Sequence, residues 1–337
     1  MFDNHHMSKK KLLFLFFYMV FLVFFLEICS RGYYFFINKI DFFSSPHDLV
    51  YMWYPDLKKL NQYKYDKDSY NILFLGGSVL NKDWGNVPSY IKKSGEALGK
   101  KINLVNLAAS AHGSLDSYYK YKWLEKNRFD FVLFYHGINE VRANNIPPEL
   151  WKKDYSHYSW YDEVNFYFRH PLLNKTGLLL PHFLNHILFR MNSKKQIPTR
   201  SPREEWMEYG KEIKTRESFM ENLLKIISIA TKKNEPLIIP TFAYAFFDPE
   251  SYVGADGEKI GYIWIWGKPE NVVSGINVHN TVIRYLAQKG DFIFLDQEKL
   301  MRGNGQYFKD VCHFTDAGSK FFSETILKKI ISWNQNY

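Results

Sequence analysis

Five short apolar runs, separated by stretches with helix-like spacing of apolar residues, constrain the fold of this 337-residue chain more than any other feature. The runs are Asn71–Leu75, Lys101–Asn106, Phe131–Tyr135, Pro236–Pro240 and Asp291–Leu295. The helix-like stretches are residues 86–99, 114–127, 203–233, 272–289 and 315–334. Alternation of strand and helix is typical of a parallel sheet covered by helices on both faces. The sequence therefore predicts an α/β fold with a five-stranded parallel sheet.

The composition fits a globular protein, with 46% hydrophobic and 23% charged residues. This hydrophobic content excludes a disordered protein. The chain has only two cysteines, Cys29 and Cys312, which excludes a small protein held together by disulfides. Lys and Arg total 44 against 35 Asp and Glu, and the positive excess is spread along the chain. This argues against a nucleic-acid partner and fits an anionic membrane or an acidic glycan equally well.

The N-terminus predicts a membrane-spanning helix. Three lysines, Lys9–Lys11, precede a strongly apolar segment over residues 12–38. This length is enough to cross a hydrocarbon layer of about 30 Å, and Glu27 and Arg31 can pair one helical turn apart. The lysines place the tail, residues 1–11, in the cytoplasm and the rest of the chain on the extracytoplasmic side. A cleaved signal peptide or a buried hairpin helix is the alternative, although no small-residue cleavage site follows the run.

Beyond this anchor the chain divides into a connector, residues 39–68, and a main domain, residues 69–337. Residues 141–200 interrupt the domain with an aromatic-rich insertion between the third strand and the next helix. The later part of the insertion is apolar enough for a lid, a membrane-facing surface or the wall of a substrate groove. A second small hydrophobic cluster under a long loop is an equally good interpretation.

Chemically distinctive residues follow the ends of the predicted strands. Ser78 comes directly after the first strand and two glycines, small residues fill Asn106–Ser114 after the second, and His136–Glu140 follows the third. Asp310 and His313 follow the fifth. Ligands collect at the carboxyl ends of parallel strands, so we expect a site where these segments meet. A phosphate-binding loop is the alternative at Ser78, but the Gly-Lys-Ser/Thr ending of such loops is missing.

These four segments, in this order, resemble the SGNH (GDSL-like) hydrolase family over residues 69–337. The resemblance implies a three-layer α/β/α fold and Ser-His-Asp esterase or acyl-transfer chemistry. Carried over by position, it makes Ser78 the nucleophile, His313 the general base and Asp310 the group that orients the imidazole. It also makes the Asn139 side-chain amide and the Ser78 backbone N–H donors to the oxyanion.

Three positions depart from the pattern of the family. The first motif reads Gly-Gly-Ser in place of Gly-Asp-Ser, and the third ends in Glu140 where the family has Asp. In the second motif, the position of the expected glycine is Ala111, and Gly113 follows two residues later. The donor there is a main-chain N–H, so Ala111 serves if its backbone dihedrals are ordinary. Gly113 is the better candidate if the loop needs a left-handed residue, so both are candidate oxyanion donors.

The sequence thus predicts an extracytoplasmic, single-pass membrane esterase that removes an acyl group, with acetyl preferred, from a cell-surface glycan or glycolipid. Aromatic residues that stack on sugar rings, with Trp264 and Trp266 among them, favour this substrate class. One alternative is an O-acyltransferase with the same acyl-enzyme, and another is a catalytically silent glycan-binding or scaffold protein. The prediction includes no cofactor and no metal, because no spacing of His, Cys, Asp and Glu indicates a metal site. It names no protein partner.

Overall fold

The computed structural model describes residues 8–191, 197, 203–245 and 264–336. Contacts within the chain separate two compact units. The smaller unit combines residues 1–55 with 156–198, and the larger unit combines residues 56–155 with 199–337. Part of the predicted cytoplasmic tail and part of the predicted insertion lie outside the described residues. The predicted domain boundary at residue 69 stays a prediction.

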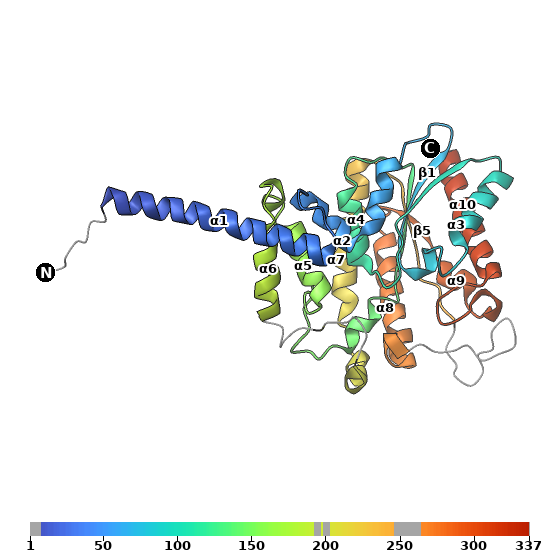
Figure 1. The fold of residues 1–337 in the computed structure, drawn as a ribbon. Coiled ribbons are helices and arrows are strands. Elements are labelled where there is room, and N and C mark those ends of the chain that lie inside the picture. Colours follow the sequence, from blue (N-terminus) through green and yellow to red (C-terminus); the bar gives the residue numbers. More distant parts are fainter. Residues whose placement is uncertain (1–7, 192–196, 198–202, 246–263, 337) are drawn as a thin grey trace. The chain divides into compact units, whose positions relative to one another are not determined.

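The larger unit is built on a five-stranded parallel sheet, as predicted (Figure 1). Its strands are β1 (Tyr70–Gly76), β2 (Ile102–Asn106), β3 (Phe131–Tyr135), β4 (Leu237–Pro240) and β5 (Ile293–Leu295). Their order across the sheet is β2-β1-β3-β4-β5, and every neighbouring pair is parallel. All of β3 and nearly all of β1 are buried, which explains why these strands have continuous apolar runs in place of an alternating pattern.

Helices cover both faces of this sheet, so the larger unit has three α/β/α layers. Its longer helices are α3 (Val87–Ala97), α4 (Ser114–Trp123), α7 (Thr215–Lys233), α8 (Pro269–Ala287) and α10 (Asp316–Asn336), with the short α9 (Gln297–Met301) after β5. Helices α3 and α10 pack together on one face, and α4, α7 and α8 pack side by side on the other (Figure 1). The predicted fold class is therefore confirmed.

The predicted helix over residues 203–233 is broken near its start. Residues Glu204–Lys211 form a 3-10 helix, η7, and the α-helix begins only at Thr215. The Thr215 N–H donates to Asn144 Oδ1 at 3.0 Å, and its hydroxyl lies 2.9 Å from His279 Nε2. These partners come from distant segments of the chain, so local periodicity could not reveal the break.

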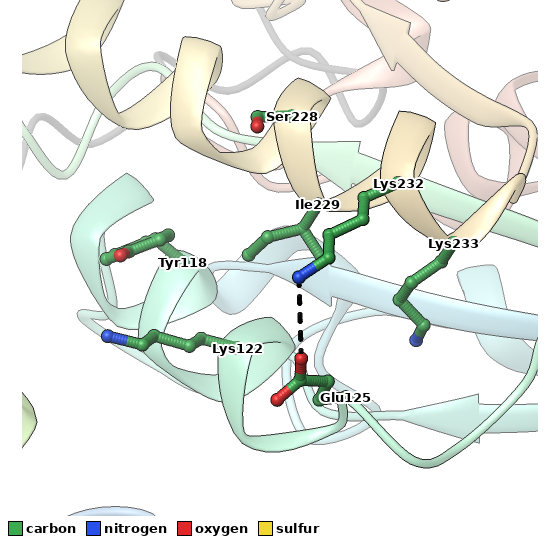
Figure 2. Close-up of a pocket in the computed structure, with 7 residues that line it drawn as sticks. All are labelled: Tyr118, Lys122, Glu125, Ser228, Ile229, Lys232 and Lys233. Atoms are coloured by element: carbon green, nitrogen blue, oxygen red, sulfur yellow. Dashed lines mark ion pairs between the residues drawn. The ribbon is translucent and has the colours of Figure 1, made fainter. Parts of the chain in front are cut away.

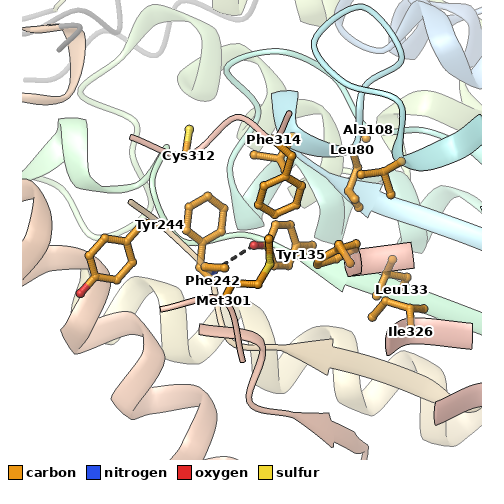
Figure 3. Packing of buried hydrophobic residues seen from close by; sticks show 14 of the residues in the cluster. Leu80, Ala108, Leu133, Tyr135, Phe242, Tyr244, Met301, Cys312, Phe314 and Ile326 are labelled. Carbon is orange, nitrogen blue, oxygen red and sulfur yellow. Dashed lines mark hydrogen bonds between the residues drawn. The ribbon is translucent and has the colours of Figure 1, made fainter. Parts of the chain in front are cut away.

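The hydrophobic core of the larger unit supports the segments that carry the predicted catalytic residues. Figure 3 shows part of this core, in which the Tyr135 ring stacks on Phe242 with centroids 4.9 Å apart. The Tyr135 hydroxyl also accepts the Ala243 N–H at 2.9 Å. Leu80 and Phe314 are fully buried in the same cluster. Burial of each such side chain contributes about 1.5–3 kcal/mol to the free energy of folding. Leu80 lies two residues after the predicted nucleophile, and Phe314 directly follows the predicted base.

The smaller unit begins with α1 (Lys9–Asn38), a helix of 30 residues. The Ser8 hydroxyl accepts the Lys11 N–H at its start, and Lys39 ends it in the left-handed conformation with φ 58°. Within the described parts of the chain, α1 is the one helix long and apolar enough to cross a membrane or to act as a signal sequence. The predicted pair of Glu27 and Arg31 forms, with Nε 2.7 Å from Oε1.

Three further α-helices are found among the described residues of the smaller unit: α2 (Val50–Trp53), α5 (Ser159–Arg169) and α6 (Leu180–Met191). Aromatic rings connect them, with centroid distances of 5.3 Å between Trp53 and Tyr167 and 6.2 Å between Tyr54 and Trp160. The aromatic residues of the insertion therefore take part in a second hydrophobic cluster, which was one of the predicted alternatives.

Candidate active site

The segments that follow β1, β2 and β3 meet at one edge of the sheet. Gly76, the last residue of β1, pairs with Tyr135 at the end of β3, and Phe74 pairs with Asn106 at the end of β2. Ser78 then opens a single 3-10 turn, η3 (Ser78–Leu80), and is 6% exposed. The parallel pairing thus brings the first three predicted motifs to the same edge.

Ser78, His313 and Asp310 form a continuous hydrogen-bond chain. The Ser78 Oγ lies 2.7 Å from His313 Nε2, and His313 Nδ1 lies 2.6 Å from Asp310 Oδ2. The imidazole is 3% exposed, so little water competes for either contact. The fourth motif, more than 230 residues after Ser78 in the sequence, therefore lies directly against it.

A tight loop holds the Asp310 carboxylate in place. Its Oδ1 accepts the backbone N–H groups of Cys312 and His313 at 2.9 and 2.8 Å. An antiparallel bridge between Phe308 and Phe314 closes the loop. Burial by itself would raise the pKa of Asp310, but the hydrogen bond and charge of His313 and the two backbone donors together lower it below its usual value. Asp310 is therefore a carboxylate at neutral pH and can hold a proton on His313 Nδ1.

Two tryptophans flank the imidazole. The Trp84 ring stacks on His313 with centroids 4.7 Å apart and planes 21° apart, and 44% of Trp84 is exposed. Trp266 lies farther away, at 6.4 Å, and is 2% exposed. Trp266 was a predicted sugar-stacking candidate, whereas the sequence analysis did not single out Trp84. Its place six residues after Ser78, in the segment before α3, was the only available signal.

The Asn139 side chain is fixed next to the turn that precedes Ser78. Its Nδ2 donates to the His112 carbonyl at 2.8 Å, and its Oδ1 accepts from Arg142 Nη2 at 3.1 Å and from Trp266 Nε1 at 3.4 Å. A Cβ on Gly77 would lie only 2.6 Å from Asn139 Nδ2. This position therefore needs glycine for space, because the amide occupies the room of a side chain.

Arg142 and Trp266 also contact each other, since the guanidinium lies 5.9 Å from the indole centroid. Both fix the orientation of the Asn139 amide group through its oxygen. Because the amide is planar, the second Nδ2 proton, which does not bond to the His112 carbonyl, then also has a fixed direction. Arg142 was missed in the sequence. It lies two residues after the third motif, and no sequence pattern distinguishes an arginine at that position.

The second motif has an unusual backbone. Ala111, and not Gly113, adopts the left-handed conformation, with φ 63°. Gly113 is extended, with φ −104° and ψ −173°, and its N–H donates to Asp116 Oδ2 at 2.8 Å. Ala111 therefore does not meet the condition of ordinary dihedrals that was set for it, and the left-handed residue of this loop is not Gly113.

Glu140, the departure in the third motif, is a structural contact. Its carboxylate accepts the Ser114 N–H at the start of α4, and the side chain is buried. Burial raises the pKa of Glu140, and the Ser114 N–H partly opposes this. His136, in the same motif, is also buried, with Nε2 2.7 Å from Ser117 Oγ, and burial lowers its pKa to about 3. His136 is therefore a neutral structural histidine.

Asp310, Cys312 and His313 also form the one group of His, Cys and acidic side chains, among the described residues, whose possible metal-ligand atoms lie within 4.8 Å of one another. Burial, followed by the charge of Asp310, raises the pKa of the Cys312 thiol well above its usual value. Thiols bind metals as thiolates, so a protonated Cys312 is a poor ligand. The geometry fits the Asp–His pair of the hydrogen-bond chain better than a metal centre.

Two hollows of the larger unit lie away from this chain of residues. The first, of about 470 Å³, opens between α4 and α7 and is lined by Tyr118, Lys122 and Lys232 among others (Figure 2). There Lys232 pairs with Glu125 at 3.8 Å, as the dashed line in Figure 2 shows. The second, of about 430 Å³, lies between α3 and α10. Neither includes Ser78, Asp310 or His313.

No protein-family model matches the sequence, and no curated protein matches it. Solved structures do match, among them a putative acylhydrolase from Bacteroides fragilis with 14% identity, a TM-score of 0.45 and coverage of 83% of this chain and 94% of that one. A GDSL-like lipase from Bacteroides thetaiotaomicron has 13% identity, a TM-score of 0.47 and coverage of 83% and 98%. An acetylxylan esterase from Geobacillus stearothermophilus has 13% identity, a TM-score of 0.44 and coverage of 79% and 96%. Identities and TM-scores this low carry no information about the reaction of this chain.

Proposed function

We propose that this chain is a membrane-anchored serine esterase of the SGNH type, which removes an acyl group, with acetyl preferred, from a cell-surface glycan or glycolipid. One observation carries the proposal: the hydrogen-bond chain from Ser78 Oγ through His313 to Asp310, with distances of 2.7 and 2.6 Å. A serine hydroxyl is a weak nucleophile until an adjacent base accepts its proton, and a third group keeps that base correctly oriented.

In the first half of the reaction, Ser78 Oγ attacks the carbonyl carbon of the ester while its proton passes to His313 Nε2. The tetrahedral intermediate collapses, the C–O bond to the sugar breaks, and His313 returns the proton to the leaving hydroxyl. Asp310 accepts a hydrogen bond from Nδ1 throughout and stabilises the imidazolium charge. In the second half, water attacks the carbonyl carbon of the acyl-enzyme, the bond to Ser78 Oγ breaks, and the acyl group leaves as a carboxylic acid. His313 transfers the protons as in the first half.

The oxyanion of this intermediate is bound by three N–H donors in our proposal. They are Asn139 Nδ2, the Ser78 backbone N–H and the Ala111 backbone N–H. We prefer Ala111 because it stands at the position of the expected donor in the second motif, and Gly113, whose N–H donates to Asp116 at 2.8 Å, is the alternative. Donors fixed in advance stabilise the transition state without reorganisation at the moment of reaction.

The proposed substrate class rests on the surroundings of the triad and on α1. The Trp84 ring is 44% exposed beside His313, and an exposed indole next to the reacting atoms suits a sugar ring. If α1 is an uncleaved anchor with Lys9–Lys11 in the cytoplasm, the catalytic domain acts outside the cell membrane, where acylated glycans and glycolipids occur.

An O-acyltransferase is a second candidate, because the same base can activate a sugar hydroxyl in place of water. The partly exposed Trp84 favours this candidate to the same degree, since it could hold an acceptor sugar. A catalytically silent glycan-binding protein is disfavoured by the complete hydrogen-bond chain. Release of free acetate, compared with transfer of acetate to an added oligosaccharide, separates the two reactions.

The test is hydrolysis of a chromogenic acetyl ester by the full-length chain in detergent. A fragment that starts near residue 40 is less suitable, because it would remove Glu27 from its contacts with residues 179 and 180 in the smaller unit. We expect the wild type to hydrolyse the ester and the Ser78→Ala variant to be inactive. Equal rates for the two proteins would contradict the proposed nucleophile.

Topology is tested separately from catalysis. A reporter enzyme that works only outside the cytoplasm should be active when fused after Tyr337, and the full-length chain should stay in the membrane fraction after a wash with high salt or alkali. A hydrophobic span is not held by charge, so screening does not release it. Recovery of a shortened soluble protein would show a cleaved signal sequence.

A further inference from the structure

Helix α6 exposes an apolar stripe. Leu184, Ile187, Leu188 and Met191 lie on one side of the helix at spacings of three and four residues, with exposed fractions of 45, 37, 59 and 76%. Its other side is packed, as Phe189 is only 9% exposed. The exposed side of a helix on a water-soluble protein is normally polar, so this side of α6 needs an apolar partner.

Further apolar side chains of the same unit are exposed at the end of the predicted span and beyond it. Phe43 is 87% exposed, Leu172 is 75% exposed, and Phe36 and Ile37 at the end of α1 are 69 and 63% exposed. Exposed apolar side chains in this number indicate a contact with a protein or a membrane.

A buried ion pair fixes the start of α6 to α1. Glu27 on α1 accepts the N–H groups of Leu179 and Leu180 at 3.0 and 2.8 Å, and its Oε1 lies 2.7 Å from Arg31 Nε. A carboxylate at this place satisfies N–H groups that the first turn of a helix leaves without partners. The contact lies directly after residues 12–26, whose side chains are almost all exposed.

Arg31 extends the same contact to two loops. It donates to the carbonyls of Phe42 and Ser44 at 2.8 and 3.1 Å, and to that of Gly177 at 2.8 Å. Farther along α6, the Tyr33 hydroxyl lies 2.8 Å from His186 Nε2. The apolar stripe of α6 therefore has a fixed place beside the part of α1 where the run of exposed apolar residues gives way to buried polar ones.

We infer that α6 lies in the boundary between headgroups and acyl chains of the bilayer that α1 enters, with Leu184, Ile187, Leu188 and Met191 toward the acyl chains. The inference rests on the anchoring role of α1 in the proposed function. Lipid is the occupant because Glu27 fixes the start of α6 to α1 directly after the exposed apolar run of that helix. An amphipathic helix in this position buries its apolar side by about 5–10 Å.

Charge supports the same partner. Lys39, Lys175 and Arg190 are exposed in the smaller unit, and exposed basic residues near a membrane surface attract anionic headgroups. Asp41 is the exposed acidic residue in the same stretch of chain after α1. The smaller unit is thus a membrane-bound platform with a spanning helix and a second helix along the surface.

The experiment measures the depth of single fluorescent labels in the full-length chain. Cys29 and Cys312 are replaced by alanine, and one new cysteine is introduced by Leu188→Cys, by Val20→Cys in the middle of α1, or by Leu300→Cys on α9. All three positions are exposed, at 59, 51 and 48%, so a label fits without repacking. The protein is placed in vesicles of phosphatidylcholine and phosphatidylglycerol that carry nitroxide quenchers either near the headgroup or near the chain end.

An interfacial helix lies at shallow depth. We therefore expect the nitroxide near the headgroup to quench the label at position 188 at least about twofold more strongly than the nitroxide near the chain end. The label at position 20 should show the reverse order, and that at position 300 should not be quenched. Quenching at 20 without quenching at 188 would overturn the inference and leave the anchor intact. No quenching at 20 would overturn both. A blue-shifted but unquenched label at 188 would show a protein partner, such as a second copy, and overturn the lipid assignment.

Discussion

The two compact units place their large apolar side chains differently. Of the 31 exposed ones among the described residues, 24 belong to the smaller unit and seven to the larger, although the larger contains more of the chain. In the larger unit, Leu, Ile and Phe fill the core under the sheet. Because burial of apolar surface drives folding in water, this difference fits a larger unit that is surrounded by water and the proposed contact of the smaller unit with lipid.

Buried polar groups also have different roles in the two units. In the smaller unit, Glu27 and Arg31 use their hydrogen bonds to fix chain segments to one another. In the larger unit, His313 contacts the Ser78 hydroxyl, and Asn139 donates to the His112 carbonyl beside the turn that precedes Ser78. A change at Glu27 or Arg31 should therefore alter stability and membrane binding but not the rate of the reaction. A change at His313 or Asn139 should alter the rate of the reaction but not stability or membrane binding.

The largest effect is expected at Ser78. Ser78→Ala should lower kcat by about 10⁴–10⁶-fold, as for loss of a triad nucleophile, while the melting temperature stays close to that of the wild type because only a hydroxyl is removed. Steady-state ester hydrolysis and thermal unfolding measure the two quantities. Residual activity within a few-fold of the wild type would mean that another group is the nucleophile.

Glu27 provides the matching test in the smaller unit. Glu27→Ala leaves Arg31 without its carboxylate and should destabilise that unit by about 3–5 kcal/mol, as for a broken buried ion pair. Hydrogen exchange at Leu179 and Leu180 should become faster, and ester hydrolysis in detergent should stay within twofold of the wild type. A loss of hydrolysis equal to the loss of protection would show that the units are not independent.

At Asn139 the effect should be confined to the reaction. Asn139→Ala should lower kcat by about 10²–10³-fold with little change in KM, because one donor to the oxyanion is lost. Asn139→Asp is the matched control, since it keeps the shape of the side chain and removes the N–H donor. An increase in KM with unchanged kcat would make Asn139 a substrate-binding residue.

The fold could be predicted largely from the sequence because β1, β3 and β4 are short apolar runs that are buried along nearly their whole length. Ile72, Leu73 and Leu75 in β1 are completely buried, so they show no alternation that could be mistaken for another structure. The start of α7 could not be predicted, because it depends on Asn144 and His279, which approach Thr215 only in the folded chain.

Only part of the candidate site follows from the order of the sequence motifs. The positions of Ser78, Asp310 and His313 follow from motif order, whereas the choice between Ala111 and Gly113 depends on backbone dihedrals and on the side chain of Asp116. Trp84 and Arg142 belong to none of the four motifs. Their significance arises from stacking and hydrogen bonds across long sequence distances, which composition and spacing do not encode.

Arg142 should act on the reaction through Asn139, as a positioning residue. Arg142→Met removes the donor at 3.1 Å from Asn139 Oδ1, and should lower kcat by about 10-fold, the value of one hydrogen bond from a charged group. Arg142→Lys tests whether charge alone suffices, because lysine lacks the planar fork of arginine. In the Asn139→Ala background the same substitutions should have little further effect. Full additivity of the two changes would show that Arg142 acts on the substrate directly.

The smallest effect concerns acid pH and Asp310. Its pKa is lowered in the folded chain, because the contacts with His313 and two backbone N–H groups outweigh the effect of burial. Such a carboxylate stabilises the fold above its unfolded pKa of about 4, and the contribution is lost as the pH falls through the lower folded value. Thermal unfolding of the wild type and of Asp310→Asn should therefore differ more at about pH 6 than at about pH 3. Leu179 and Leu180 should show the same hydrogen-exchange protection in both proteins, because this charge acts in the larger unit. An equal difference in melting temperature at both pH values would mean that the charge of Asp310 does not contribute to stability, and that its role is confined to orienting the imidazole.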